Sequence, residues 1–201
     1  MSDFPEFFKK IPSIVTYDPL AELLGTFKNG KIIYNYIQIV KAAGHSCPTV
    51  AGAYMMTYHA LKALYPDSLP VRGEIKVEFK EDLQDGVAGV IANVVTNITG
   101  ATDKSGFKGL GGKFARHSLM FFNAPINSSI RFTRLDTGKS VNVYYDPSRV
   151  SGDPRMQPLM QKAIQGIATE EEKELFGELW QEKVKKILID HFDDIVKTEI
   201  S

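Results

Sequence analysis

The chain has 201 residues, the length of one domain or of one domain with an added segment, and 43% hydrophobic and 24% charged residues are typical of a globular protein. Its 24 lysines and arginines balance its 24 aspartates and glutamates, so charge gives no reason to expect nucleic acid or an anionic membrane as partner. The N-terminus does not resemble a signal peptide, and no apolar stretch approaches the ~20 residues of a transmembrane helix. A single cysteine fits a reducing compartment, so we expect a cytoplasmic protein.

The first third of the chain contains three helix signals and one turn signal. Residues 1–17 predict an irregular arm with exposed aromatic side chains. Asp18 followed by proline predicts the start of a short helix, and Asn29-Gly30 predicts a hairpin between the apolar runs on either side. The stretch NYIQIVKAAG then predicts a brief helix that ends at Gly44.

A third helix is expected to begin at Pro48 and to run to about residue 65. Three small residues near its start would permit close packing against a neighbouring element: Ala51, Gly52 and Ala53. The alternation in VRGEIKVEFKE predicts a strand, and Asp85 is expected to cap an apolar helix that Gly100 ends.

The second half begins with strands and continues with helices. The runs HSLMFF, SIRFTRL and KSVNVYYD predict three strands, the last two joined by a turn at residues 136–138. Beyond residue 154 the pattern is helical to the end, with a capping box from Thr169 to Glu172. This order predicts an α+β fold, with a mixed or antiparallel sheet packed with helices in residues 1–150 and a C-terminal helical extension in residues 151–201.

The residues most suggestive of chemistry are His45 and Cys47, which immediately precede the helix that starts at Pro48. The positive end of a helix favours a thiolate, and a thiolate with an imidazole forms a ligand pair that suits zinc. The same pair could instead act as a nucleophile and its base, or be a partly buried thiol beside a loop histidine. A catalytic zinc normally has three protein ligands, and His117 is the first choice for the third.

Other candidate residues are weaker. His59 lies about three turns into the helix, too far from Cys47 to share its metal, and we interpret it as structural. Asp85 could act as a ligand or base in addition to capping a helix. The glycine-rich loop SGFKGLGGKF fails the spacing of a phosphate-binding loop, but with Lys113 it could bind an anionic substrate or close over the His45–Cys47 turn.

Three segments, in order, resemble the E-subunit family of formylmethanofuran dehydrogenase. GHSCPTVAG resembles its Gly-His-x-Cys-Pro turn, DLQDGVAGVIANVVTNITGAT resembles its second segment, and Lys113 in GLGGKFA resembles the Gly-Lys that follows. The resemblance spans roughly residues 35–145. It implies an α+β core, a homodimer, and a metal-binding or active-site cleft around His45 and Cys47. The family's name comes from an association with molybdenum- or tungsten-dependent formylmethanofuran oxidation.

The chain departs from the family pattern in two places. Ala101 stands where many members have a cysteine, which argues against a dithiol redox role. Some members carry a cysteine-rich zinc finger at the C-terminus, which one cysteine cannot build, so the C-terminal helices and the N-terminal arm are expected to be additions to the family core.

Three functions are compatible with these residues. The first is a divalent-metal protein, with zinc on His45, Cys47 and a third group, that acts as an enzyme or as an accessory to a molybdenum or tungsten enzyme. The second is an enzyme with Cys47 as nucleophile and His45 or His117 as base, for which Lys113 and Asp85 are further catalytic candidates. The third is a noncatalytic subunit whose dimer cleft binds a small organic cofactor or a partner enzyme.

Overall fold

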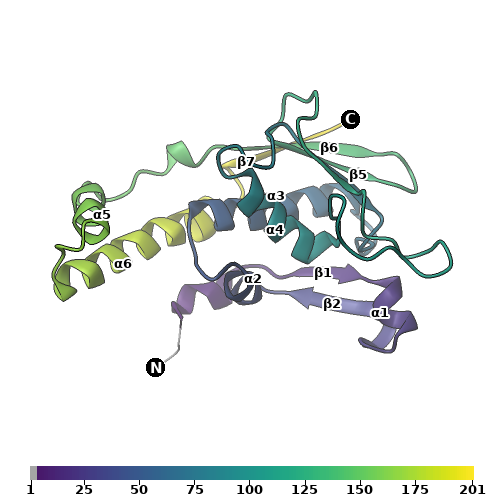
Figure 1. Ribbon diagram of the computed structural model, residues 1–201, viewed down its shortest axis with the longest axis horizontal. Helices are drawn as coiled ribbons and strands as arrows, with labels where there is room; N and C mark the ends of the chain where they lie inside the picture. The colour runs from purple at the N-terminus through teal and green to yellow at the C-terminus, as the bar shows by residue number, and fades with distance from the viewer. Residues whose placement is uncertain (1–3) are drawn as a thin grey trace.

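The computed structural model describes residues 4–201 and stacks three layers (Figure 1). A five-stranded sheet forms the upper layer, two long helices form the middle one, and a two-stranded ribbon with a short helix forms the lower one. The predicted α+β class is confirmed.

The large sheet has the strand order β4-β3-β5-β6-β7. Its β3–β4 pair is parallel and its other pairs are antiparallel. Along β3, residues 75, 77 and 79 are buried, as the alternation predicted. The bounds are β3 Ile75–Phe79, β4 Met120–Phe121, β5 Ile130–Arg134, β6 Ser140–Tyr145 and β7 Val196–Ile200.

The middle layer consists of α3 (Pro48–Leu64) and α4 (Ala88–Thr99). Every residue from 50 to 57 of α3 is buried, because the sheet covers one side of this helix and the lower layer covers the other. Helix α3 therefore carries the core of the molecule, and the residues just before it are fixed to that core.

The lower layer contains β1 (Ile14–Tyr17) and β2 (Lys31–Tyr34), which pair antiparallel, and the helices α1 (Pro19–Leu23) and α2 (Tyr36–Ala43). Over residues 4–17 the expectation of an irregular arm is wrong, and its first three residues lie outside the described part of the chain: η1 (Glu6–Lys10) precedes β1, and Phe8 is buried with its ring edge-on to Tyr36. Aromatic burial of this kind orders a segment whose sequence shows no strong periodicity.

The turn at Asn29-Gly30 forms, but the prediction that the run directly before it would pair with the strand after it is wrong. Both residues have positive φ, 56° and 60°, and end the short helix η2 (Lys28–Gly30). The following strand, β2, pairs with β1, which lies before α1, rather than with the run directly preceding the turn. The sequence therefore identified the turn geometry but not the pairing.

Most predicted helix ends are confirmed. Asp18 accepts N–H bonds at the start of α1, Gly44 ends α2 with φ 78°, and Gly100 ends α4 with φ 77°. Asp85 is not a cap, because Gly86 has φ 51° and α4 begins only at residue 88. Among residues 4–201, no helix is long and apolar enough to cross a membrane.

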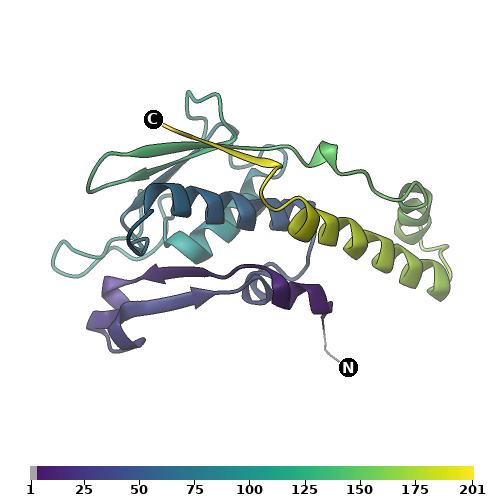
Figure 2. The same cartoon turned by 180° about the vertical axis from the view of Figure 1, so that it is seen from behind.

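The C-terminal segment contains η3 (Pro147–Arg149), α5 (Met156–Ile164), α6 (Glu170–Lys185) and η4 (Lys186–Asp190). Helices α5 and α6 extend away from the body (Figures 1 and 2), and the predicted capping box opens α6. The segment is not helical to its end, because β7 pairs with β6. The large sheet thus contains strands from both of the predicted parts, 1–150 and 151–201.

Candidate functional site at the His45–Cys47 turn

Cys47 is the N-cap residue of α3 and is half-buried. Its Sγ accepts a hydrogen bond from the backbone N–H of Val50, at 3.4 Å. The sulfur thus takes the place that a serine or aspartate oxygen usually occupies at a helix start. The sulfur therefore lies at the N-terminal end of a 17-residue helix.

His45 is exposed, and its Nδ1 lies 3.0 Å from the carbonyl oxygen of Ala43. A carbonyl oxygen only accepts hydrogen bonds, so Nδ1 carries the proton. In the neutral imidazole Nε2 then has a free lone pair. The turn therefore presents an sp² nitrogen acceptor two residues before the thiol.

Ser46, between the two, is held by two different helices. Its hydroxyl lies 2.9 Å from the hydroxyl of Tyr36 in α2. Its carbonyl oxygen accepts two hydrogen bonds from α6, from Nε1 of Trp180 at 3.0 Å and from Nε2 of Gln181 at 3.1 Å. Burial raises the pKa of Tyr36 well above its ordinary value, so its hydroxyl stays protonated. The backbone of the turn is consequently fixed from both sides.

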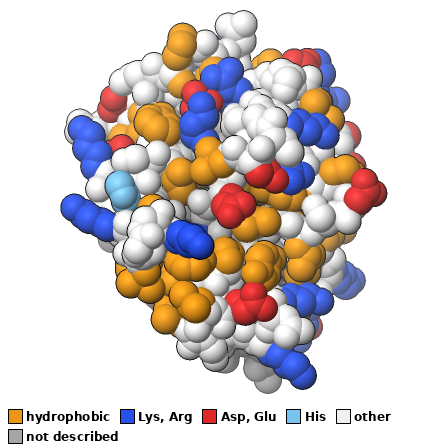
Figure 3. Space-filling model, turned by 90° about the vertical axis from the view of Figure 1, so that its right-hand side faces the viewer, with side chains coloured by type: hydrophobic (Ala, Val, Ile, Leu, Met, Phe, Trp, Pro, Cys, Tyr) orange, Lys and Arg blue, Asp and Glu red, His pale blue; other side chains and the backbone are white. Residues whose placement is uncertain are grey.

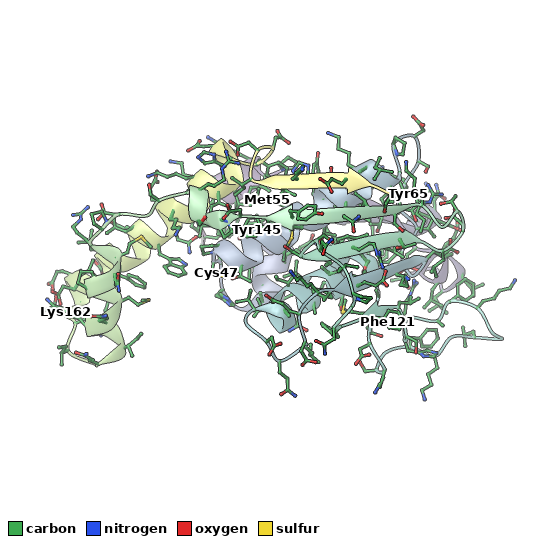
Figure 4. All side chains as sticks on the ribbon, turned by 90° about the horizontal axis from the view of Figure 1, so that it is seen from above. Cys47, Met55, Tyr65, Phe121, Tyr145 and Lys162 are labelled. Carbon is green, nitrogen blue, oxygen red and sulfur yellow. The ribbon has the colours of Figure 1, made fainter. Side chains whose placement is uncertain are left out.

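Tyr145, the last residue of β6, fixes the start of α3 (Figure 4). Its hydroxyl donates to the carbonyl oxygen of Pro48 at 2.7 Å. Its ring lies directly on Gly52, where an added Cβ would come within 2.2 Å of Cε1. The predicted close packing of the small residues is confirmed, and the neighbour is Tyr145.

Two hollows flank the turn. One, of about 310 Å³, lies between α2 and α4 and has His45 in its lining. The other, of about 370 Å³, begins at Pro48 and Thr49 and extends between the start of α4 and the end of β3. Each side of the turn therefore adjoins space that a small molecule could occupy.

His117 and Lys113 lie in and just after the glycine-rich loop that follows the C-terminal end of α4. Helix α4 starts beside Thr49, and its residues Thr96 and Asn97 line the hollow that contains His45. His117 is half-buried, with Nδ1 3.1 Å from Oγ of Ser118. Lys113 is exposed and forms a backbone bridge with Leu110. No residue of the glycine-rich loop is among those that line the two hollows beside the turn.

Asp85 lies in an exposed turn before α4, where its carbonyl oxygen accepts the N–H of Ala88. Within residues 4–201, no three His, Cys, Asp or Glu side chains are placed to hold one metal ion. One chain thus offers His45 and Cys47 as donors, and His117 does not complete a site with them. His59, interpreted as structural, has its Nε2 2.8 Å from the carbonyl oxygen of Phe192.

Four side chains that position the turn were not found from the sequence: Tyr36, Tyr145, Trp180 and Gln181. Trp180 is the only tryptophan of the chain, which is the one signal that could have singled it out. Its hydrogen bond to residue 46 spans 134 positions, a separation at which a single sequence carries no pairing information.

Residues 42–197 match the sequence profile described as "FmdE, Molybdenum formylmethanofuran dehydrogenase operon". The chain belongs to the FmdE family. The matched range starts just before the His45–Cys47 turn and continues through α6 into β7. The C-terminal helices therefore lie inside the FmdE match, whereas the resemblance of the three sequence segments had placed them outside the family core.

No curated protein matches this FmdE chain. Among solved structures it is similar to an FmdE-like protein of the tungsten formylmethanofuran dehydrogenase type from Syntrophus aciditrophicus. That similarity has a TM-score of 0.45 and 15% sequence identity, and it covers 84% of this chain and 72% of the other.

Proposed function

We propose that this FmdE-family protein is a cytoplasmic metal-binding protein in which His45 and Cys47 hold a divalent cation, zinc being the best match to an imidazole and a thiolate. The site would lie in a cleft between two copies of the chain. The protein would act as an enzyme itself or as an accessory to a molybdenum or tungsten enzyme.

The observation that carries the proposal is the hydrogen bond from His45 Nδ1 to the carbonyl oxygen of Ala43. Histidines that bind metals commonly donate the proton of the other ring nitrogen to a carbonyl or carboxylate, which fixes the tautomer and the ring. Here that bond is already present and leaves Nε2 free. Cys47, two residues away, has its sulfur at the start of α3, where it accepts the N–H of Val50.

The two donors fit zinc by type, but one chain does not complete a site, because zinc in proteins normally has three or four protein ligands. The remaining donor must come from outside the described part of this chain. A bound divalent ion at this position would polarise a carbonyl group or activate a water molecule.

A second copy is supported by exposed apolar surface on the lower layer. Apolar side chains gather on the end of the molecule that carries α1 (Figure 3), including Leu23, Leu24 and Phe27, which are 60%, 62% and 45% exposed. A shallow hollow beside this patch runs over β2 to Gln38 in α2, and α2 also lines the hollow that contains His45. Contiguous exposed apolar surface of this kind marks interaction sites.

The test combines elemental analysis with light scattering on purified full-length protein. We expect bound zinc in the wild type at a fixed ratio to the protomer, and loss of most of it in both His45→Ala and Cys47→Ser. His191→Ala is the matched control, since His191 is a half-buried histidine bonded to Asp194 and should retain the metal. His117→Ala shows whether that residue of a second copy contributes.

Light scattering should give a dimer for the wild type. A metal ratio near zero that neither substitution changes would leave the proposal without support. A monomer that nevertheless holds zinc would rule out the shared cleft while leaving the ligand pair in place.

A further inference from the structure

The larger hollow beside the turn is a cavity of about 370 Å³, within the range of small-molecule sites in proteins. It lies between the first turns of α3 and α4 on one side and the strands β3, β5 and β6 on the other. We propose that this cavity binds a small organic anion with an aromatic or alicyclic body.

The inner part of the cavity is apolar. Side chains from α3, β3, α4 and β5 line it, including Met56, Phe79, Ile91 and Ile130. Met56, Phe79 and Ile130 are at most 2% exposed, so this surface is a fixed part of the core. Such walls favour a ring or a compact hydrocarbon, because they offer dispersion contacts and no hydrogen-bonding partner.

The rim is polar and includes Thr49, Lys80, Glu81, Asn127 and Ser129. This placement of a few polar groups around an apolar pocket fixes the orientation of a ligand with one polar end. The ligand would therefore enter with its apolar body first and keep its polar end at the rim.

The charge of the rim favours an anion. Lys80 and Glu81 cancel one another in formal charge, while the starts of α3 and α4, at Pro48 and Ala88, add partial positive charge. Lys76, two residues before Glu78 on β3, is paired with it, whereas Lys80 has no ion pair among residues 4–201. The lysine available to a ligand is therefore Lys80.

The inference does not rest on bound metal, because the cavity begins at Pro48 and neither His45 nor Cys47 is among its lining residues. Treatment with EDTA and the Cys47→Ser substitution should leave binding unchanged. Failure of the metal proposal and failure of this one can thus be told apart.

The probe is 8-anilinonaphthalene-1-sulfonate, an aromatic monoanion, titrated into the folded full-length protein and followed by its fluorescence. We expect saturable binding at one site per chain. Ile91→Trp fills the cavity and should weaken binding at least tenfold. The matched control is Val90→Trp, since Val90 is also half-buried on α4 but lines the other hollow, and this variant should bind as the wild type does.

Two further variants keep the test decisive. Val87→Trp changes an exposed rim residue and should also weaken binding, which covers the case in which Ile91→Trp does not fold. Lys80→Met should weaken binding of the anionic probe at least threefold and leave the uncharged analogue N-phenyl-1-naphthylamine unaffected. Absence of saturable binding, or equal binding by the Ile91 and Val90 variants, would overturn the proposal. An unchanged affinity in Lys80→Met would overturn the assignment of the anionic end.

Discussion

The indole Nε1–H of Trp180 donates to the carbonyl oxygen of Ser46 at 3.0 Å, which joins α6 to the residue between His45 and Cys47. Trp180→Phe removes this bond and keeps most of the ring packing. We expect it to lower the free energy of unfolding by about 1 kcal/mol, the typical net value of one hydrogen bond. Urea unfolding followed by circular dichroism measures this, since the variant has no tryptophan fluorescence.

The same carbonyl oxygen accepts a second bond from Gln181, which gives a coupling test. The Trp180→Phe/Gln181→Met double variant should lose more stability than the two single variants together, because Ser46 then loses its last protein donor. Strict additivity would show that the two bonds contribute to stability independently, although they share an acceptor.

Gly52→Ala is expected to destabilise the protein, against the usual trend for a helix interior. Alanine is intrinsically better than glycine in a helix by about 1 kcal/mol, but here its Cβ would lie 2.2 Å from the Tyr145 ring. The clash forces the ring or the helix to move, at a net cost of about 1–3 kcal/mol. Thermal and urea unfolding of the variant measure the difference.

Gly177→Ala on α6 is the matched control, because nothing lies within 4 Å of its would-be Cβ. This substitution should stabilise the protein by up to about 1 kcal/mol. If both substitutions change stability in the same direction, the steric explanation at Gly52 is incorrect.

A buried ion cluster predicts a specific pH dependence. Asp18 accepts from Arg116 at 2.7 Å and from Arg72 at 2.9 Å, and its side chain is 4% exposed. Burial alone would raise the pKa of Asp18, but the hydrogen bonds from Arg72 and Ala21 N and the charge of Arg116 together lower it below 3.8. The carboxylate therefore stabilises the fold above its unfolded pKa, and that contribution is lost as pH falls through the folded value.

Asp18→Asn keeps the size and the helix cap and removes the charge. At pH 7 it should cost about 3 kcal/mol, because two arginines lose their buried counter-charge. The loss of unfolding free energy relative to wild type should have its largest value above roughly pH 5 and should decrease toward pH 3. Asp136→Asn, in an exposed pair with Arg134, should cost only a few tenths of a kcal/mol. If the difference in unfolding free energy between wild type and Asp18→Asn does not change with pH, the charge of Asp18 is not its cause.

Zinc should protect the single thiol. Iodoacetamide labelling of Cys47, read as one added mass on the intact chain, should be faster after EDTA treatment than after zinc loading. His45→Ala should abolish the protection, whereas His191→Ala should keep it. Identical rates with and without zinc would argue against Cys47 as a ligand and favour its interpretation as a nucleophile or as a packing residue.

Much of the fold near the turn was predictable because its signals are local. Gly44 ends α2 because glycine readily adopts a positive φ. Pro48 begins α3 because its fixed φ suits the first turn of a helix. Strands β1 and β7 were missed for the opposite reason. Four of the five residues of β7 are exposed, so no alternation marks it, and it forms only because β6 is there to pair with it.

The candidate site was predictable in part. The sequence placed His45 and Cys47 just before the start of a helix, and the structure confirms this placement. Their role as metal ligands stays a prediction. His117 was chosen for its place after the glycine-rich loop at the start of an expected strand, and among residues 4–201 it does not form a three-donor group with His45 and Cys47. Tyr36, Tyr145 and Trp180 act through contacts between distant segments, which composition and spacing do not encode.

The bonds from α6 to Ser46 also constrain the order of events during synthesis. Residues 45–47 leave the ribosome early, but Trp180 and Gln181 are translated about 135 positions later. Before then, among residues 4–201, the side-chain bond to Ser46 comes from the hydroxyl of Tyr36. The backbone around the thiol is therefore completed only once α6 has been synthesised, and a chain that stops before α6 lacks both donors to the carbonyl oxygen of Ser46.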